Sequence, residues 1–260
     1  MNILITGGNG YIAQALLYAL KDKYEVMTIS RKDFDLTNKE ATDNFFNGRL
    51  FDTIIHCAVK GGSRLKEETW EDMDDNLKMY YNLLGNKDHF NKLIHFGSGA
   101  EYYAKNTPYG LSKRVIGESM KDKHSFYNLR IFAVFDHNEL DTRFIKSNIK
   151  RYINKESIRV HENKFMDFMH MADLVKIVDY YINNDNLPKE INCNYESSFK
   201  LSDIANIINR LENHTVDIIV EKNSEYEYIA KTYNYLPIDF IGLENGIKQV
   251  YKKLKKHEII

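Results

Sequence analysis

Residues 2–12, Asn2-Ile3-Leu4-Ile5-Thr6-Gly7-Gly8-Asn9-Gly10-Tyr11-Ile12, join an apolar run to a glycine cluster and the start of a helical pattern. The apolar run predicts a buried strand, and an amphipathic helix is predicted over residues 11–20. Glycines in such a turn let the backbone approach a pyrophosphate, and the helix N-terminus offers free N–H groups to that anion. No Gly-Lys-Ser/Thr follows, which argues against a Walker loop. The stretch therefore predicts a dinucleotide-binding unit.

The first half of the chain continues this alternation. Further strands are predicted at residues 25–30, 52–58, 92–96 and 128–134, and further helices at 70–86 and from 109 onward. Apolar strands alternating with amphipathic helices predict an α/β fold with a doubly wound parallel sheet, a Rossmann fold, whose ligands bind at the carboxyl edge.

The second half of the chain is less regular. We find no strong strand between residues 135 and 164, and helices are predicted near 203–211 and 244–254. We therefore expect a dinucleotide-binding Rossmann domain from residues 1–134 and 165–195. A small substrate-binding lobe is expected from residues 135–164 and 196–260.

Composition excludes several classes of protein. The 260 residues include 36 Lys plus Arg against 37 Asp plus Glu, which gives no electrostatic case for a nucleic-acid partner. No apolar run could span a bilayer and no leader pattern precedes the first strand, so we expect a cytoplasmic protein without membrane contact. Two cysteines, Cys57 and Cys193, are too few for a disulfide framework or a zinc site, and we expect no metal.

The end of the second strand bears on the choice of dinucleotide. It reads Ser30-Arg31-Lys32. An acidic residue there would bind the ribose hydroxyls of NAD, whereas an arginine accommodates the 2′-phosphate of NADP. Arg31 therefore favours NADP(H), with NAD possible. The alternative is that Arg31 stacks on the adenine or faces solvent.

Three residues form a candidate catalytic set. Tyr109 and Lys113 are four residues apart and so share one face of a helix, and Ser98 ends the preceding strand. A nearby ammonium lowers the pKa of a tyrosine from its usual value of about 10. A serine hydroxyl can bind the same substrate oxygen. The set suits proton transfer to or from a carbonyl that gains or loses hydride.

Six segments together resemble the extended short-chain dehydrogenase/reductases, the NAD-dependent epimerase/dehydratase family. They are residues 6–12, 55–58, 96–98, 108–113, 129–132 and 165–174. The resemblance implies cofactor contacts from Gly7, Gly10, Tyr11, Ile12, Arg31, Asp35, Leu36, Cys57, Ala58, Val59 and Lys113. It also implies a structural role for Asn76 and a homodimer formed through helices near 70–86 and 109–122. One departure is Ala13, where many members have a third glycine.

Within this family, residues 56–62 resemble the GDP-L-fucose synthases and other nucleotide 4-keto-6-deoxysugar reductases. Those synthases also epimerise, using a cysteine and a histidine where this chain has Ala100 and Arg143, neither of which can move a proton. The resemblance implies NADPH-dependent reduction of the 4-keto group of a nucleotide-linked deoxysugar, in glycan or deoxysugar biosynthesis. The expected substrate contacts are Lys60, Gly99, Ala100, Arg143 and Lys164.

Three alternatives stay open. A nucleotide-sugar 4-epimerase needs no further acid here, but such enzymes retain NAD and usually carry an acidic residue in place of Arg31. A 4,6-dehydratase places an Asp-Glu pair directly after the catalytic hydroxyl residue, whereas this chain has Glu101 one place late, and such a slip usually turns a side chain away from the site. A non-enzymatic dinucleotide sensor typically loses Tyr109 or Lys113, and this chain keeps both.

Overall fold

The computed structural model describes residues 1–62 and 66–258, with side chains described as far as residue 256. The chain divides into two compact units. Unit 1 comprises Met1–Ile131 and Val175–Asn192, and unit 2 comprises Phe132–Leu174 and Cys193–Ile260. The sequence analysis placed residues 165–174 with the dinucleotide-binding domain, whereas they cluster with unit 2.

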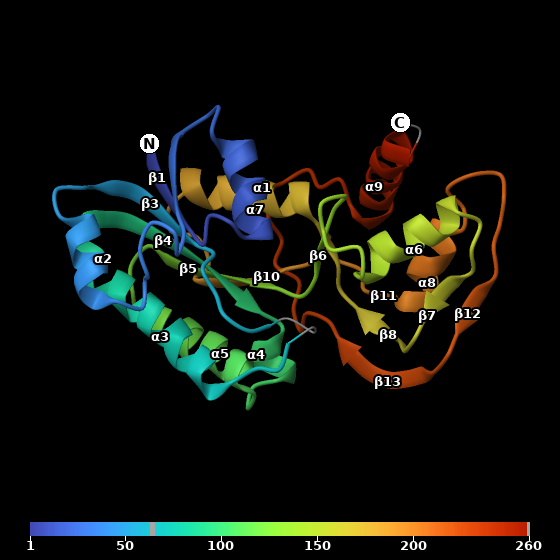
Figure 1. Cartoon of the computed structure of the whole chain (residues 1–260), viewed down its shortest axis with the longest axis horizontal. Helices are drawn as coiled ribbons and strands as arrows, with labels where there is room; N and C mark the ends of the chain where they lie inside the picture. Colours follow the sequence, from blue (N-terminus) through green and yellow to red (C-terminus); the bar gives the residue numbers. More distant parts are fainter. Residues whose placement is uncertain (63–65, 259–260) are drawn as a thin grey trace. The chain divides into compact units, whose positions relative to one another are not determined.

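Unit 1 is built on a six-stranded sheet with helices on both faces (Figure 1). Its strands are β1 (Asn2–Thr6), β2 (Glu25–Ile29), β3 (Phe51–His56), β4 (Phe90–Ser98), β5 (Phe126–Ile131) and β10 (Glu190–Cys193). The strand order is β10-β5-β4-β3-β1-β2, and the pairings from β5 to β2 are parallel. The predicted doubly wound α/β sheet is confirmed.

The helices around this sheet explain the burial of its strands. They are α1 (Tyr11–Leu20), α2 (Lys39–Phe46), α3 (Trp70–Gly85), α4 (Ala100–Tyr103), α5 (Pro108–Met120) and α7 (Met171–Asn183), with a 3-10 turn at Lys87–His89. Figure 1 shows α1 and α7 on one face and α3 and α5 on the other. Because both faces are covered, β3 and β4 are buried along almost their whole length.

The strand order places a switch point at β1. This strand has β2 on one side and β3 on the other, so the connections leave its carboxyl end in opposite directions. Ligands of doubly wound sheets bind in the crevice that such a reversal opens. The glycine turn after β1 and residues 57–59 after β3 therefore meet at the expected cofactor site.

Helix α2 was not predicted from the sequence. It is eight residues long and buries Thr42 and Phe46, too few positions to give a helical period. Its start is fixed by a cap instead, since Asn38 Oδ1 accepts a hydrogen bond from Ala41 N at 3.0 Å.

Unit 2 consists of short strands packed with three helices (Figure 1). The strands are β6 (Val134–Phe135), β7 (Ile158–Val160), β8 (Asn163–Met166), β9 (Met169–His170), β11 (Phe199–Lys200), β12 (Ile218–Val220) and β13 (Asn223–Tyr228); the helices are α6 (Phe144–Ile153), α8 (Leu201–Ile208) and α9 (Leu243–Glu258). Strand β8 lies between β11 and β13, and β9 pairs with β6, which is why residues 165–174 belong to this unit.

A separate apolar core holds unit 2 together. It includes Ile145 and Ile149 of α6, Ile204 of α8 and Ile247 of α9, all fully buried. The sequence predicted α8 and α9 but no regular structure between residues 135 and 164. That region contains α6 as well as β7 and β8, which at three and four residues are too short to give an alternating pattern.

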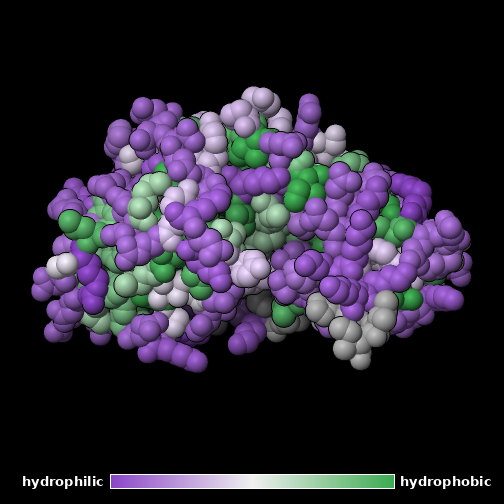
Figure 2. Space-filling model, turned by 90° about the horizontal axis from the view of Figure 1, so that it is seen from above, coloured by the Kyte–Doolittle hydropathy of each residue, from purple (hydrophilic) through white to green (hydrophobic). Residues whose placement is uncertain are grey.

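The surface gives no sign of a membrane-spanning segment. In the described part of the chain no helix is long and apolar enough to cross a bilayer. Hydrophilic residues cover most of the face shown in Figure 2, and hydrophobic residues appear there in separate small groups.

Close packing at the carboxyl end of β4 gives a first prediction. A Cβ atom at Gly97 would lie 2.3 Å from Glu101 Oε1 and 2.4 Å from Asn128 Oδ1. Gly97→Ala should therefore lower the free energy of unfolding by about 1–3 kcal/mol, measured by thermal unfolding. Gly85→Ala is the matched control, because no described atom lies within 4 Å of a Cβ there. Equal melting temperatures for both variants would contradict this account of β4.

Candidate active site

The glycine turn after β1 is held against the loop after β3. Gly7 has a φ of +68°, and a Cβ there would lie 2.7 Å from backbone atoms of Ala58. Both the backbone conformation and the lack of space therefore require glycine. Thr6 Oγ1 accepts from Ala58 N at 3.1 Å and lies 2.8 Å from His56 Nδ1. Burial, helped by the charge of Lys113, lowers the pKa of His56 to about 3, so its neutral ring can accept from the Thr6 hydroxyl.

Helix α1 begins at this turn without a side-chain cap. Among the described residues no side chain caps Gly10, and the first turn contains no acidic residue. Gly10 N donates to Gly7 O at 2.8 Å, which closes the turn, and Tyr11 and Ile12 follow half-buried. A helix N-terminus of this kind favours an anion such as a pyrophosphate. Ala13, in place of a third glycine, is fully buried.

The loop after β2 carries the residues expected at the adenosine end of the cofactor. Arg31 is exposed two residues beyond the strand. Asp35 accepts from Thr37 N and Thr37 Oγ1, both at 2.9 Å, and these bonds lower its pKa. The side chain of Leu36 is buried in the core under α3, so this residue can offer a ligand little more than its backbone.

Lys60, expected at the substrate, lies in an ion pair. Its ammonium contacts the carboxylate of Asp75 on α3, which raises its pKa. Asn76 fixes its backbone, accepting from Lys60 N at 2.8 Å and donating to Lys60 O at 2.9 Å. The charge of Lys60 also interacts with those of Arg31 and Asp35, so it contributes to the field at the adenosine end.

The predicted catalytic residues gather at the carboxyl end of β4 and the start of α5. Lys113 is 5% exposed, and its Nζ donates to Phe96 O at 2.6 Å and lies 5.8 Å from the ring centre of Tyr109. Burial lowers the pKa of Lys113 to about 8, against the opposing charge of Glu101. Ser98 is also buried, and its Oγ accepts from Ala100 N at 3.1 Å.

Two expected contact residues after β3 differ in exposure. Val59 is 43% exposed, and Cys57 is half-buried. Burial raises the pKa of the Cys57 thiol to about 12, so it stays protonated and acts by packing rather than as a nucleophile.

The sequence analysis did not predict the contacts of Gly62 and Glu68 that hold Tyr109 in position. A Cβ at Gly62, which has a φ of +69°, would lie 2.8 Å from Tyr109 Cζ, so this backbone rests on the ring. Glu68 accepts from Gly62 N and from Tyr109 N, both at 3.3 Å. Glu68 and Tyr109 are 41 residues apart, and nothing in the local sequence links them.

Glu101 does not present a free acid. Its Oε1 accepts from Ser98 N at 2.9 Å, and its Oε2 accepts from Arg130 Nε at 2.9 Å and Arg130 Nη2 at 2.8 Å. Gly99 and Ala100, the neighbours expected at the substrate, are buried. A 4,6-dehydratase needs an acid that can reach the sugar, and this carboxylate is bound on both oxygens.

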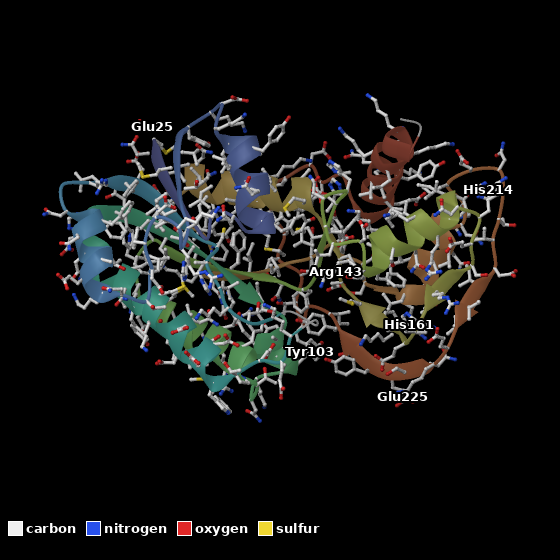
Figure 3. The ribbon with its side chains drawn as sticks, in the orientation of Figure 1. Glu25, Tyr103, Arg143, His161, His214 and Glu225 are labelled. Carbon is white, nitrogen blue, oxygen red and sulfur yellow. The ribbon has the colours of Figure 1, made fainter. Side chains whose placement is uncertain are left out.

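Unit 2 holds two basic residues that were expected to contact the substrate. Arg143 lies just before α6 (Figure 3), with its side chain 38% exposed and its Nε 3.8 Å from Glu139 Oε2. Burial raises the pKa of Glu139 to about 8. Lys164 Nζ lies 2.7 Å from Glu162 Oε2 and 4.8 Å from the ring centre of Tyr226.

The motif at residues 165–174 is structural in unit 2. Asp173 is fully buried and accepts from Tyr195 Oη at 2.6 Å, Ile241 N at 2.9 Å and Gly242 N at 3.1 Å. His170 N donates to the same tyrosine oxygen at 3.1 Å. These bonds fix the chain around β9 and the start of α9.

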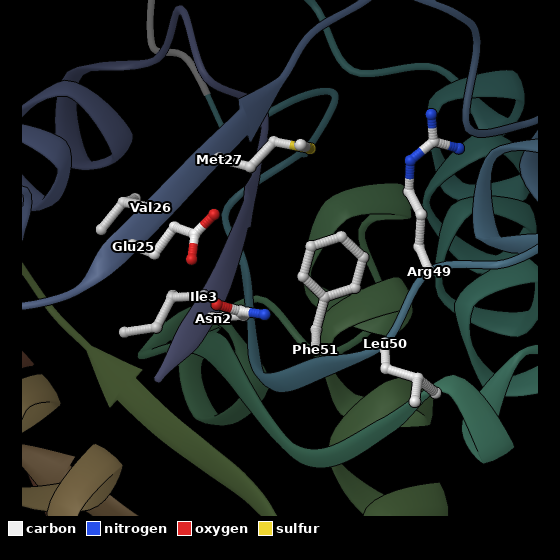
Figure 4. Close-up of a pocket in the computed structure, with 8 residues that line it drawn as sticks. All are labelled: Asn2, Ile3, Glu25, Val26, Met27, Arg49, Leu50 and Phe51. Carbon is white, nitrogen blue, oxygen red and sulfur yellow. The ribbon is translucent and has the colours of Figure 1, made fainter.

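A pocket elsewhere in unit 1 lies away from these residues (Figure 4). It is lined by Asn2, Ile3, Glu25, Val26, Met27, Arg49, Leu50 and Phe51. These residues begin β1, β2 and β3, at the opposite end of the strands from the glycine turn, so this pocket is not the dinucleotide site. Within residues 1–62 and 66–258 no three His, Cys, Asp or Glu side chains are grouped to hold a metal ion.

Two buried lysines of unit 1 allow a matched stability test. Lys113 has one acceptor among the described residues, whereas Lys92 donates to Tyr181 O, Ile182 O and Asn184 O at 2.7–3.0 Å. Lys113→Met should raise the free energy of unfolding by about 1–3 kcal/mol at pH 7, because it removes a poorly solvated charge. Lys92→Met should lower it by about 1–3 kcal/mol.

The gain from Lys113→Met should depend on pH. The folded pKa of Lys113 is about 8, below its ordinary value of 10.5, so the cost of burying the ammonium is complete below pH 8. It disappears as the pH rises toward 10.5. Thermal unfolding of both variants from pH 7 to 10 checks this, and a destabilised Lys113→Met at pH 7 would refute it.

Comparisons with known proteins bear on the family and the fold of this chain. GDP-L-colitose synthase of Yersinia pseudotuberculosis is 23% identical over 299 residues, covering 96% of both chains. Two solved structures share the fold: GDP-mannoheptose C4 reductase from Campylobacter jejuni with NADP bound (TM-score 0.79, 16% identity, 98% of both chains), and UDP-glucose 4-epimerase from Thermotoga maritima (TM-score 0.81, 15% identity, 99% of this chain and 100% of that one). The model of the NAD dependent epimerase/dehydratase family matches residues 3–194, and the chain therefore belongs to that family.

Proposed function

We propose that this protein is a nucleotide-sugar oxidoreductase that reduces the 4-keto group of a nucleotide-linked deoxysugar with NADPH. The observation that carries the proposal is the buried ammonium of Lys113. It lies 5.8 Å from the ring centre of Tyr109 and donates to Phe96 O, two residues before Ser98 in the chain. The relatives support the substrate class, since one is named a GDP-L-colitose synthase and another a GDP-mannoheptose C4 reductase.

The residues after β1 and β3 fit a nicotinamide dinucleotide. The turn at Gly7 has no room for a Cβ, and the uncapped α1 offers N–H groups to the pyrophosphate. Exposed Arg31 suits the 2′-phosphate of NADP. When bound, the reduced cofactor supplies the hydride. We assign the cofactor to unit 1 and the nucleotide of the substrate to unit 2, with Arg143 and Lys164 at its diphosphate.

In the proposed reaction, the 4-keto carbon accepts hydride while its oxygen takes a proton, giving a secondary alcohol. Tyr109 gives its hydroxyl proton to that oxygen and becomes a phenolate. The ammonium of Lys113 stabilises the phenolate and so lowers the pKa of Tyr109. Ser98 donates its hydroxyl hydrogen to the carbonyl oxygen, because its own oxygen already accepts from Ala100 N at 3.1 Å.

Reduction without epimerisation follows from the residues that stand in sequence where the epimerising synthases have a cysteine and a histidine. Ala100 has no proton to move, and Arg143 is always protonated. Lys60, Gly99 and Ala100 are then contacts for the sugar rather than catalysts. From the family resemblance we also propose a cytoplasmic homodimer formed through α3 and α5, where α3 exposes Trp70 and Tyr81.

Tyr109→Phe tests the proton donor. Turnover should fall about 10²–10⁴-fold while NADPH still binds, because the variant loses a hydroxyl and keeps the ring. The assay follows loss of NADPH absorbance with a panel of nucleotide 4-keto-6-deoxysugars, and NADPH fluorescence reports binding. Tyr18→Phe, a change at a tyrosine 77% exposed on α1, is the control. Wild-type turnover by Tyr109→Phe would remove Tyr109 from the mechanism.

The same panel tests the function itself. Consumption of NADPH with one sugar establishes the reductase and identifies the nucleotide. If no sugar causes consumption and NAD co-purifies with the protein, the reductase proposal fails and a 4-epimerase takes its place.

Arg31→Ser tests the choice of cofactor. A charge-assisted bond to the 2′-phosphate is worth about 1.5–3 kcal/mol, so the KM for NADPH should rise about 10–100-fold. The KM for NADH should stay unchanged, since NADH has no phosphate there. Arg49→Ser, at the amino end of β3, is a control of equal charge change. A rise for both cofactors would mean that Arg31 contacts the adenine instead.

A further inference from the structure

We propose that Glu101 is a positioning residue of the active site, which holds the backbone of Ser98 with one carboxylate oxygen and fixes a negative charge beside Lys113. The inference deepens the proposed function and rests on it, because turnover is its main readout. It assigns a role to Glu101, which the sequence analysis compared with the catalytic acids of 4,6-dehydratases.

The first carboxylate oxygen sets the position of Ser98. Glu101 Oε1 accepts from Ser98 N at 2.9 Å, and the neighbouring Ala100 N donates to Ser98 Oγ at 3.1 Å. Residues of α4 therefore hold both the backbone nitrogen and the hydroxyl oxygen of Ser98. Gly97 leaves room for this contact, since a Cβ there would lie 2.3 Å from Glu101 Oε1.

The second carboxylate oxygen is held by a buried guanidinium. Glu101 Oε2 accepts from Arg130 Nε and Nη2 at 2.9 and 2.8 Å, and the two side chains are 4% and 6% exposed. Arg130 also donates to Tyr102 Oη at 2.6 Å, Glu190 Oε2 at 3.0 Å and Asn192 Oδ1 at 3.2 Å. These partners restrict the conformations of the Arg130 side chain, which in turn holds the carboxylate of Glu101 in place.

The charge of Glu101 acts on Lys113 across the packed helices. Helix α4, which carries Glu101, packs on α5, which carries Lys113, and a Cβ at Gly117 of α5 would lie 3.4 Å from Glu101 Oε2. Besides Tyr109 on its own helix, the titratable groups that face Lys113 are Glu101 from α4, Cys57 after β3, His56 from β3 and His95 from β4.

Glu101 is the anion among these groups. Burial lowers the pKa of His56 to about 3 and that of His95 well below its usual range, so both rings are neutral. Burial raises the pKa of the Cys57 thiol to about 12. Arg130 offsets part of the carboxylate's field, yet Glu101 still opposes the loss of the Lys113 proton. Without it, Lys113 would be a neutral amine over more of the working pH range.

Two substitutions separate the two roles. Glu101→Gln keeps an oxygen for Ser98 N and removes the charge. Its kcat should fall about tenfold relative to wild type at pH 8.5, with less than a twofold change at pH 6, because the alkaline limb moves to lower pH. Glu101→Asp keeps the charge but is too short to reach Ser98 N, so kcat should fall about tenfold at every pH while the limb stays in place.

Controls isolate these effects from general damage. Glu118→Gln, an exposed acid on α5, should leave both kcat and the pH profile unchanged. The KM for NADPH should stay constant in all three variants. An unchanged alkaline limb in Glu101→Gln would overturn the electrostatic role, and a wild-type kcat in Glu101→Asp would overturn the positioning of Ser98.

A second measurement needs no substrate and separates this inference from the proposed function. Wild-type stability should begin to rise with pH near 8, where folded Lys113 releases its proton before the unfolded chain does. In Glu101→Gln the rise should begin at lower pH. If wild-type protein oxidises no NADPH with any sugar, the function fails but this shift still tests the charge of Glu101, and its absence would refute that role.

Discussion

A buried ammonium with one backbone acceptor, Lys113 Nζ on Phe96 O, is the interaction on which the proposed active site depends. Taking such a charge out of water is costly, and the cost is visible in a pKa lowered to about 8. Lys92 shows that the same sheet can satisfy a buried lysine, with three carbonyl oxygens and Asp185 within 3.1 Å. The difference marks Lys92 as structural and supports the role proposed for Lys113 beside Tyr109.

The ammonium of Lys113, which has one hydrogen-bond acceptor among the described residues, needs rigid surroundings, and the residues at the carboxyl end of β4 provide them. This strand is buried along nearly its whole length and pairs with β3 and β5. Beyond its end, the ion pair of Glu101 with Arg130 ties α4 to β5. A buried pair of this kind adds little net stability, yet breaking it exposes an uncompensated charge, so it favours one arrangement of the chain. Buried polar groups of unit 1 thus hold Ser98 and Lys113 in place.

Local pattern was enough to predict part of this structure. The glycine turn and the four-residue spacing of Tyr109 and Lys113 depend on neighbours in sequence. The sheet was predicted from apolar strands that alternate with amphipathic helices. The contacts that complete the site are long-range: Glu68 meets Tyr109, and Glu101 meets Arg130 29 residues away. Such pairs leave no period in the sequence. The short strands of unit 2 were not predicted for a related reason, because three or four residues are too few to show an alternating pattern.

The fold by itself does not choose the reaction. A C4 reductase and a 4-epimerase both share it, with TM-scores of 0.79 and 0.81, so the choice belongs to individual side chains. A different activity, which inverts the carbons beside a ketone and which a 4-epimerase does not perform, needs groups to remove and return protons there. Ala100 offers none, and the carboxylate of Glu101, the nearest acid in sequence, is bound to Ser98 N and Arg130. The proposed reductase would use one proton donor, Tyr109, beside one buried cation, Lys113, to protonate the oxygen as hydride reaches its carbon. A 4-epimerase would use the same pair, and the exposed Arg31, which suits NADP, is what favours the reductase.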